Sequence, residues 1–291
     1  MKMPVGYLHS VLDFAVLSMV IYCGPSAIVA EQRGPLGRVY LVGMGPGDAE
    51  LVTFKAAKAL KDADCVYCFS YLKEEVARYA SPAKIAVASP LLMGRVCGRN
   101  PADLPPEMQE ELKQSKEELS QFTAKVRALA AAGKTVVFAD AGDPTVYCPW
   151  SWITEEFADL QPAVIPGLSS FNAGNAALEQ SITHNSASVL ISAGEDLGTP
   201  DKNGRLKMTL VLFTHRAKLK ELAPRLLVRY PSDTPIAVVC EASYPTQRVV
   251  WATLGTVLEK SAGQRLPHLY LIYVGDSLKV PAAGATVQKH D

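Results

Sequence analysis

The sequence has no net charge of either sign. Its 29 lysine and arginine residues balance 29 aspartate and glutamate residues over 291 positions. Proteins that bind nucleic acid or an anionic membrane surface usually depend on an excess of basic residues. The composition therefore argues against a nucleic-acid partner and favours a small-molecule ligand.

Cysteines in the spacing of a metal site are also missing. The one close pair, Cys65 and Cys68, lies in a segment expected to be a strand, where residues three apart point to opposite faces. We therefore expect reduced, packed thiols and no bound metal. The six cysteines are Cys23, Cys65, Cys68, Cys97, Cys148 and Cys240.

Charge is almost absent from residues 14–30, which follow a single Lys2 and precede Glu31. The run is short for a spanning helix, which needs about 20 apolar residues. Three interpretations stay open: a signal peptide cleaved near Ala30, a membrane tether, or an over-extended reading frame. We expect residues 1–36 to form a hydrophobic leader and the fold to begin near Gly37.

A glycine-rich loop follows the first expected strand. Residues 39–42 are apolar and mostly β-branched or aromatic, and the next six, Gly43-Met-Gly-Pro-Gly-Asp48, lead into an expected helix at 51–60. Loops of this kind lie at the carboxyl end of an α/β sheet, where backbone without side chains lets a ligand approach. The loop is not the dinucleotide fingerprint, because Pro46 interrupts it and Asp48 replaces the third glycine.

Two further loops repeat this arrangement. An expected strand at 134–139 runs into Asp140-Ala-Gly-Asp-Pro-Thr-Val-Tyr147, and another at 163–165 breaks at Pro166-Gly167 before a helix of small residues. Small side chains allow close approach of helix, sheet and ligand. Within the second loop, Tyr147 lines a cleft or packs in the core, and the core is favoured.

The order of elements predicts an α/β fold with two domains. Strands at 63–69 and 83–87 alternate with helices, which favours a parallel sheet, and a long helix is expected at 107–132 after an irregular stretch. The second half has more strand than helix and is expected to form a mixed sheet. We place an N-terminal α/β domain at 37–150, a C-terminal α/β domain at 151–291, and a ligand cleft between them.

Five motifs in this order resemble the tetrapyrrole (corrin/porphyrin) methylases, a family of S-adenosylmethionine-dependent methyltransferases. The resemblance spans about residues 37–276, and the last motif is most similar to the precorrin-4 C11-methyltransferase branch. The motifs are Val42-Gly-Met-Gly-Pro-Gly-Asp48, Ala141-Gly-Asp-Pro-Thr-Val-Tyr147, Val164-Ile-Pro-Gly-Leu-Ser-Ser170, Thr209-Leu-Val-Leu-Phe213, and 234–243 continuing to Arg248-Val-Val-Trp-Ala-Thr-Leu254.

The resemblance implies a fold in which S-adenosylmethionine occupies the cleft, a tetrapyrrole substrate, and a homodimer. A sulfonium cofactor needs backbone donors and acceptors with a small apolar wall, and no phosphate-binding lysine. Carried over motif by motif, the residues expected to bind the cofactor are Pro46, Ala141, Gly142, Asp143, Val146, Ser169, Ser170, Thr214 and Ala242.

The sequence departs from the family at the end of the second strand. Some members carry an Asp-Arg pair there as a candidate base, and this chain has Phe69-Ser70 followed by Tyr71. The departure argues against a uroporphyrinogen-type site and leaves the catalytic base unknown. Candidate partners for substrate carboxylates are Arg95, Arg99, His215 and Arg216, and His184 lies at a family-like position.

We interpret the chain as a methyltransferase acting on a tetrapyrrole or corrinoid intermediate. Two alternatives stay open: the same chemistry on another acceptor, and a non-catalytic protein that holds a tetrapyrrole or S-adenosylmethionine. The expected location is the cytoplasm, where the cofactor is made, with membrane association through residues 14–30 as an open alternative. The acceptor, the methylated position and the role of residues 89–132 are not determined by the sequence.

Overall fold

The computed structural model describes residues 37–93, 106–184 and 187–281, and describes side chains in the long helix from residue 113 onward. The apolar run at 14–30, together with Arg95 and Arg99, lies outside the described residues. Within the described ranges, no helix is long and apolar enough to cross a membrane.

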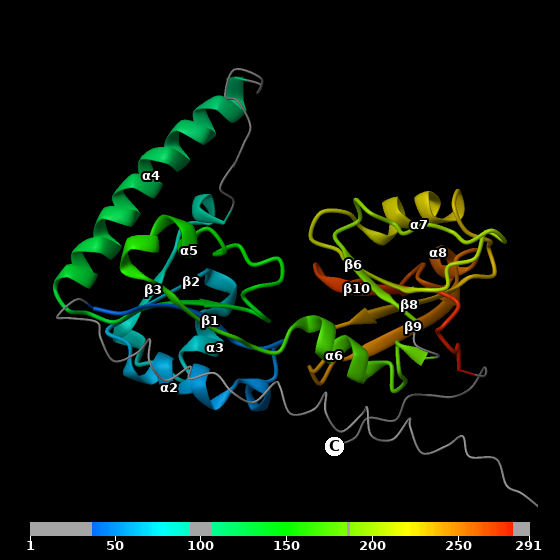
Figure 1. Cartoon of the computed structure of the whole chain (residues 1–291), viewed down its shortest axis with the longest axis horizontal. Coiled ribbons are helices and arrows are strands. Elements are labelled where there is room, and N and C mark those ends of the chain that lie inside the picture. The colour runs from blue at the N-terminus through cyan, green and yellow to red at the C-terminus, as the bar shows by residue number, and fades with distance from the viewer. Residues whose placement is uncertain (1–36, 94–105, 185–186, 282–291) are drawn as a thin grey trace, which may run out of the picture. The chain divides into compact units, whose positions relative to one another are not determined.

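The first sheet has five strands, and every neighbouring pair is parallel, as the alternation of elements predicts. Helices cover both of its faces, with α4 and α5 on one and α2 and α3 on the other (Figure 1). In the order β3-β2-β4-β1-β5 the strands are Ile85–Val87, Cys65–Cys68, Val136–Asp140, Val39–Gly43 and Ala163–Ile165, and the helices are α2 Phe54–Asp62, α3 Lys73–Val76, α4 Pro106–Ala131 and α5 Ile153–Glu156.

The second sheet is mixed, because β6 and β7 are parallel and the remaining neighbours are antiparallel. Helices α7 (Leu219–Leu227) and α8 (Val257–Lys260) contribute to the core on one face, and α6 (Ser170–Ala177) contributes to the core on the other. In the order β6-β7-β10-β8-β9 the strands are Val189–Ser192, Thr209–Phe213, Tyr270–Val274, Pro235–Cys240 and Arg248–Thr253. The predicted fold class is confirmed: α/β, with a parallel first sheet and a mixed second sheet.

The boundary between the domains stays a prediction. Strand β5 lies beyond the proposed division at residue 150 but pairs with β1 of the first sheet. The sheet pairing favours a boundary between Ile165 and Val189, where the chain leaves one sheet and enters the other.

The start of helix α2 is displaced from its expected position by local capping. The helix expected at 51–60 begins at Phe54, because Thr53 is its N-cap and the Thr53 hydroxyl accepts from the Ala56 N–H at 3.1 Å. The turn before it is a short 3₁₀ helix, η1. The 3₁₀ helices are η1 Ala49–Leu51, η2 Ser70–Leu72, η3 Pro82–Lys84, η4 Pro90–Leu92 and η6 Ala158–Leu160.

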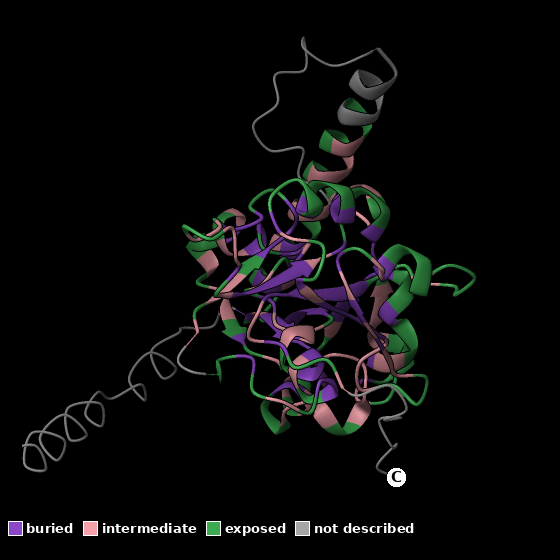
Figure 2. Cartoon of the chain, turned by 90° about the vertical axis from the view of Figure 1, so that its right-hand side faces the viewer, coloured by how far each residue is buried: buried purple, intermediate pink, exposed green. Residues whose placement is uncertain are grey.

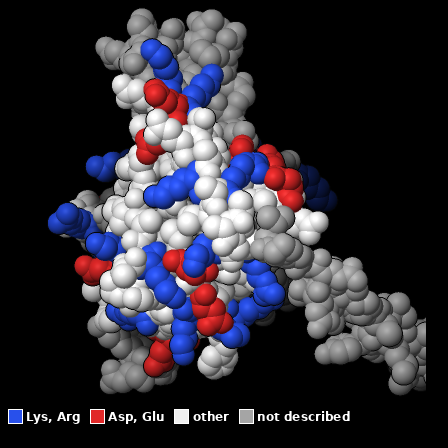
Figure 3. Space-filling model, turned by 90° about the vertical axis from the view of Figure 1, so that its left-hand side faces the viewer, with Lys and Arg blue, Asp and Glu red and all other residues white. Residues whose placement is uncertain are grey.

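The buried residues lie mainly in and around the two sheets. Figure 2 shows buried residues concentrated in the strands and on the helix faces that pack against them. All five residues of β4 and all five of β10 are buried, as expected for central strands covered on both faces. Charged side chains of both signs are interspersed on the face drawn in Figure 3.

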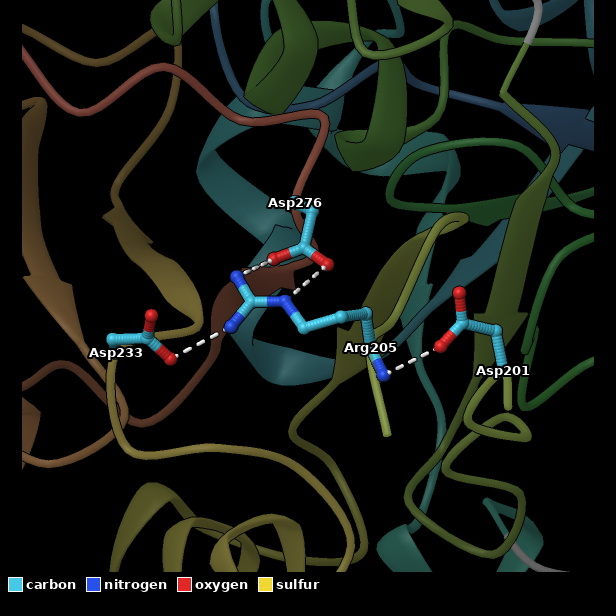
Figure 4. A network of polar contacts seen from close by, with 4 residues as sticks. All are labelled: Asp201, Arg205, Asp233 and Asp276. Atoms are coloured by element: carbon cyan, nitrogen blue, oxygen red, sulfur yellow. Dashed lines mark hydrogen bonds and ion pairs between the residues drawn. The ribbon is translucent and has the colours of Figure 1, made fainter. Parts of the chain in front are cut away.

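Arg205 ties three segments of the second sheet together. Its guanidinium donates to both carboxylate oxygens of Asp276, just after β10, and to Asp233 at 2.7 Å (Figure 4). The Arg205 backbone N–H donates to Asp201 at 2.9 Å. The network fixes the long connection between β6 and β7 against the turn that precedes β8.

Removing this network should destabilise the second sheet. We expect Arg205→Ala to lower the melting temperature by a few degrees, because two carboxylates lose their shared, planar partner. Lys207→Ala is the matched control, since the Lys207 side chain is 76% exposed and its one ion-pair partner among the described residues is Asp201, at 3.3 Å. Differential scanning calorimetry makes the comparison, and equal melting temperatures for the two variants would contradict the structural role of Arg205.

Candidate functional site

The three glycine-containing loops predicted from the sequence meet at one edge of the first sheet. Strands β4, β1 and β5 are neighbours and run parallel, so their carboxyl ends share that edge. The Met44 N–H donates to the Asp140 carbonyl at 2.7 Å. Gly45 and Gly142 then exchange backbone hydrogen bonds of 3.3 and 2.6 Å, which join the first two loops directly.

The contact between these loops requires glycine. A Cβ atom on Gly43 would lie 2.5 Å from the Gly142 carbonyl oxygen and 2.6 Å from the Gly167 nitrogen. A Cβ atom on Gly167 would lie 2.3 Å from the same oxygen. Gly142 itself has φ +72°, in the left-handed region that favours glycine. We call Gly43, Gly142 and Gly167 the three-glycine junction.

Pro46 lies in the first loop, half-buried, between the junction and a link to the second sheet. The Asp48 N–H donates to the Ser243 hydroxyl at 3.4 Å, although the two residues are 195 positions apart. Ala242, the last residue expected at the site, immediately precedes Ser243 and packs against the core cluster around β10. The first loop is thus connected to the segment that follows β8.

The second loop carries the half-buried Asp143 and Val146 and the exposed Ala141. One Asp143 carboxylate oxygen accepts from the Thr145 N–H at 2.8 Å and from its hydroxyl at 2.7 Å, which closes a tight turn. Among the described residues, the other carboxylate oxygen of Asp143 has no hydrogen-bond partner.

Tyr147 connects the second loop to the end of β7. Its φ is 55°, and its ring centroid lies 4.9 Å from those of Phe213 and His215. The favoured expectation of a core tyrosine was wrong, since the side chain is 46% exposed. The left-handed backbone turns the ring out of the first sheet's core and onto the residues that flank Thr214.

Ser169 and Ser170 begin α6 beside the junction. Ser169 is the buried N-cap, its hydroxyl accepts from the Phe171 N–H at 3.2 Å, and Asn172 closes a capping box. A Cβ atom on Gly142 would lie 3.8 Å from the Ser170 nitrogen. The N-terminal end of an eight-residue helix, with its partial positive charge, therefore lies next to the second loop.

Thr214 offers only its backbone to a ligand. Its hydroxyl donates to the Tyr270 carbonyl at 2.7 Å and accepts from the Tyr270 N–H at 3.1 Å, so the side chain is fully occupied by β10. Next to it, burial lowers the pKa of His215, and the cations of Arg216 and Lys218 lower it further. Arg216 is ion-paired with Glu195.

The structure thus brings Pro46, Ala141–Asp143 and Ser169–Ser170 together around the junction. Val146 and Thr214 are linked to this group through Tyr147 and its ring contacts, and Ala242 through the Asp48–Ser243 hydrogen bond. His184 is exposed and follows α6. Among the described residues, no group of three or more His, Cys, Asp and Glu side chains could hold a metal ion.

One polar cluster at this edge was not predicted. Asp140, the last residue of β4, is 2% exposed, and its carboxylate accepts from the Tyr71 hydroxyl and the Cys148 thiol, both at 2.9 Å. Burial raises the pKa of Asp140, and these donors only partly offset the rise. The available sequence signal for this cluster was a single aspartate at the end of an expected buried strand. Its partner Tyr71 is 69 positions away, so no local pattern connects the two residues.

A side chain at the junction should disrupt it. We expect Gly43→Ala to lower the free energy of unfolding by about 1–3 kcal/mol, because the added methyl group meets backbone atoms that cannot rotate away. Gly255→Ala is the control, since its Cβ atom would lie 3.1 Å or more from its neighbours, and should cost less than about 1 kcal/mol. Urea unfolding measures both, and equal losses would mean that the junction tolerates a side chain.

The chain is similar to known methyltransferases over most of its length. It is 28% identical over 257 residues to precorrin-4 C(11)-methyltransferase of Mycobacterium tuberculosis, covering 82% of this chain and 91% of the relative. It is 29% identical to uroporphyrinogen-III C-methyltransferase of Methanocaldococcus jannaschii, covering 84% and 98%.

Solved structures show the same similarity. Uroporphyrin-III C-methyltransferase of Thermus thermophilus in complex with S-adenosylhomocysteine matches with a TM-score of 0.56 at 27% identity, covering 84% of this chain and 94% of that one. A family model for tetrapyrrole (corrin/porphyrin) methylases matches residues 38–258, and the resemblance predicted from five motifs is confirmed. The chain belongs to the tetrapyrrole (corrin/porphyrin) methylase family.

Proposed function

We propose that this protein is an S-adenosylmethionine-dependent methyltransferase that acts on a tetrapyrrole or corrinoid intermediate. The observation that carries the proposal is the three-glycine junction, which brings three loops into backbone contact beside the N-terminal end of α6. The relatives named precorrin-4 and uroporphyrinogen-III methyltransferases support this chemistry and this class of acceptor.

The residues present fit a sulfonium cofactor. The glycines let the backbones of the loops pack closely beside the N-terminal end of α6, and Asp143 offers a carboxylate oxygen to a hydroxyl or amino group of the cofactor. When bound, the cofactor supplies a methyl group already activated for transfer. We propose that Pro46, Ala141, Gly142, Asp143, Val146, Ser169, Ser170, Thr214 and Ala242 hold it, Thr214 through its backbone.

The protein's task is then to hold the acceptor atom in line with that methyl group. A polycarboxylate acceptor would need cationic partners, and Arg216, shortly after β7, is the candidate that the structure describes. His215 contacts the Tyr147 ring, but its lowered pKa favours the neutral imidazole at neutral pH. Arg216 already pairs with Glu195 and would have to exchange partners. More specifically, we propose that the acceptor resembles precorrin-4 and is methylated at C11, because the last sequence motif is most similar to the precorrin-4 C11-methyltransferase branch.

We further propose a cytoplasmic homodimer. The described cysteines Cys65, Cys68, Cys148 and Cys240 are free thiols, which accords with a reducing compartment. Residues 14–30 are the segment through which the protein would associate with a membrane. N-terminal sequencing of the native protein tests whether this segment is retained.

Methyl transfer tests the function. Purified protein is incubated with S-adenosylmethionine and either precorrin-4 or uroporphyrinogen III under reducing conditions, and the products are weighed by mass spectrometry. We expect one of the two tetrapyrroles to gain one methyl group. Binding of both ligands without a mass change would support a non-catalytic holding protein, and failure to bind S-adenosylmethionine would overturn the proposal.

Cofactor affinity should depend on Asp143. We expect Asp143→Ala to weaken S-adenosylmethionine binding about tenfold or more in calorimetric titration, the size of one lost charge-assisted hydrogen bond. Asp196→Ala is the matched control, because Asp196 also closes a turn, accepting from the Gly198 N–H at 2.8 Å, in the connection between β6 and β7. If both variants bind as tightly as the wild type, the proposed place of Asp143 in the site is wrong.

A further inference from the structure

Tyr71 and Asp140 form a hydrogen-bonded pair across two neighbouring strands of the first sheet. Tyr71 belongs to η2, directly after β2, and Asp140 is the last residue of β4, which pairs with β2. The Tyr71 hydroxyl donates to one Asp140 carboxylate oxygen at 2.9 Å. The pair therefore lies at the same sheet edge as the three-glycine junction.

The Asp140 carboxylate is buried without a cation. Its hydrogen-bond donors are the Tyr71 hydroxyl, the Cys148 thiol and the Ala141 N–H, the last at 2.8 Å. Among the described residues, no lysine or arginine is ion-paired with it, and further titratable groups facing the cluster are Cys68 and Asp143. A buried carboxylate held only by neutral donors accepts a proton more readily than an exposed one, and its pKa is accordingly raised.

Tyr71 connects this buried group to the surface. Its side chain is 52% exposed, although its hydroxyl reaches the buried carboxylate. The ring lies parallel to Phe69, with centroids 6.1 Å apart, and Phe69 stacks on the buried Trp150 at 4.4 Å. Tyr71 therefore packs beside the aromatic stack, and about half of the residue stays accessible.

The pair adjoins the segment proposed to hold the methyl donor. Asp140 immediately precedes Ala141–Asp143, and its carbonyl accepts from Met44 of the first loop. We propose that Tyr71 is the catalytic proton acceptor for methyl transfer to carbon, and that Asp140 positions Tyr71 and takes up its proton. This inference rests on the proposed function. The pair would replace the aspartate that some family members carry at the position where this chain has Phe69-Ser70.

Every atom, electron pair and proton of the proposed methyl transfer is accounted for. The acceptor carbon forms a bond to the methyl group, the methyl–sulfur bond breaks, and the sulfur keeps the electron pair. The methylated carbon or its conjugated neighbour then loses a proton to the Tyr71 oxygen, while the Tyr71 proton passes to Asp140. The proton later leaves for water by the same route through the half-exposed Tyr71, and nothing is oxidised or reduced.

Tyr71→Phe tests the pair while keeping the aromatic stack. With whichever of precorrin-4 or uroporphyrinogen III the wild type methylates, we expect kcat to fall about 100-fold or more, the usual contribution of a positioned proton acceptor. Affinity for S-adenosylmethionine should stay unchanged, and the melting temperature should fall by no more than a few degrees, because the Asp140 carboxylate keeps its other two donors. Tyr79→Phe is the matched control, since the Tyr79 hydroxyl donates to the Ala49 carbonyl at 2.7 Å, and it should retain wild-type kcat.

The pH profile separates proton transfer from a structural role. The wild-type rate should fall as the pH is lowered through the pKa of Asp140, because a protonated carboxyl cannot take the Tyr71 proton, and burial places this limb above the usual range for aspartate. Asp140→Asn should be slow and lack the limb. If Tyr71→Phe keeps kcat within about threefold of the wild type, the pair is not catalytic, even though methyl transfer occurs. If the wild type methylates neither tetrapyrrole, the proposed function fails, and this inference fails with it.

Discussion

The close approach of three loops without side chains at the edge of the first sheet determines where every other part of the site can lie. The Gly142 carbonyl oxygen occupies the space that a Cβ atom of Gly43 or Gly167 would need. Because the contact is between backbone atoms, it brings the loops that follow β1, β4 and β5 together at one edge of the sheet. The Asp140–Tyr71 pair and the N-terminus of α6 take their positions from this arrangement.

Helix α6 links the junction at the edge of the first sheet to the second sheet. It begins beside Gly142, and Gly174 within it allows the Tyr273 hydroxyl of β10 to approach, where that hydroxyl donates to Asn175 at 2.9 Å. Tyr147 and Asp48 add contacts to the ends of β7 and β8. A substitution at the junction is therefore expected to shift the positions of Thr214 and Ala242, although both residues are distant from it in the sequence.

Much of the fold could be predicted from the sequence, because its signals are local. An apolar, mostly β-branched run that ends in glycine predicted β1, an apolar run that leads into Asp140-Ala-Gly142 predicted β4, and helical spacing predicted α4. The exact start of α2 depended on a single cap, Thr53. The Tyr71–Asp140 pair could not be predicted, because it depends on the pairing of β2 with β4, which no local pattern specifies. The exposure of Tyr147 depended on a left-handed φ that a tyrosine rarely adopts.

A crystal structure with bound S-adenosylhomocysteine tests most directly whether the three-glycine junction is one wall of the methyl donor's site. The ligand should lie against Pro46 and the Ala141–Asp143 turn, with its sulfur on the side of the loops that faces Tyr71. A ligand bound away from all three loops, in a protein whose junction is intact, would contradict this assignment.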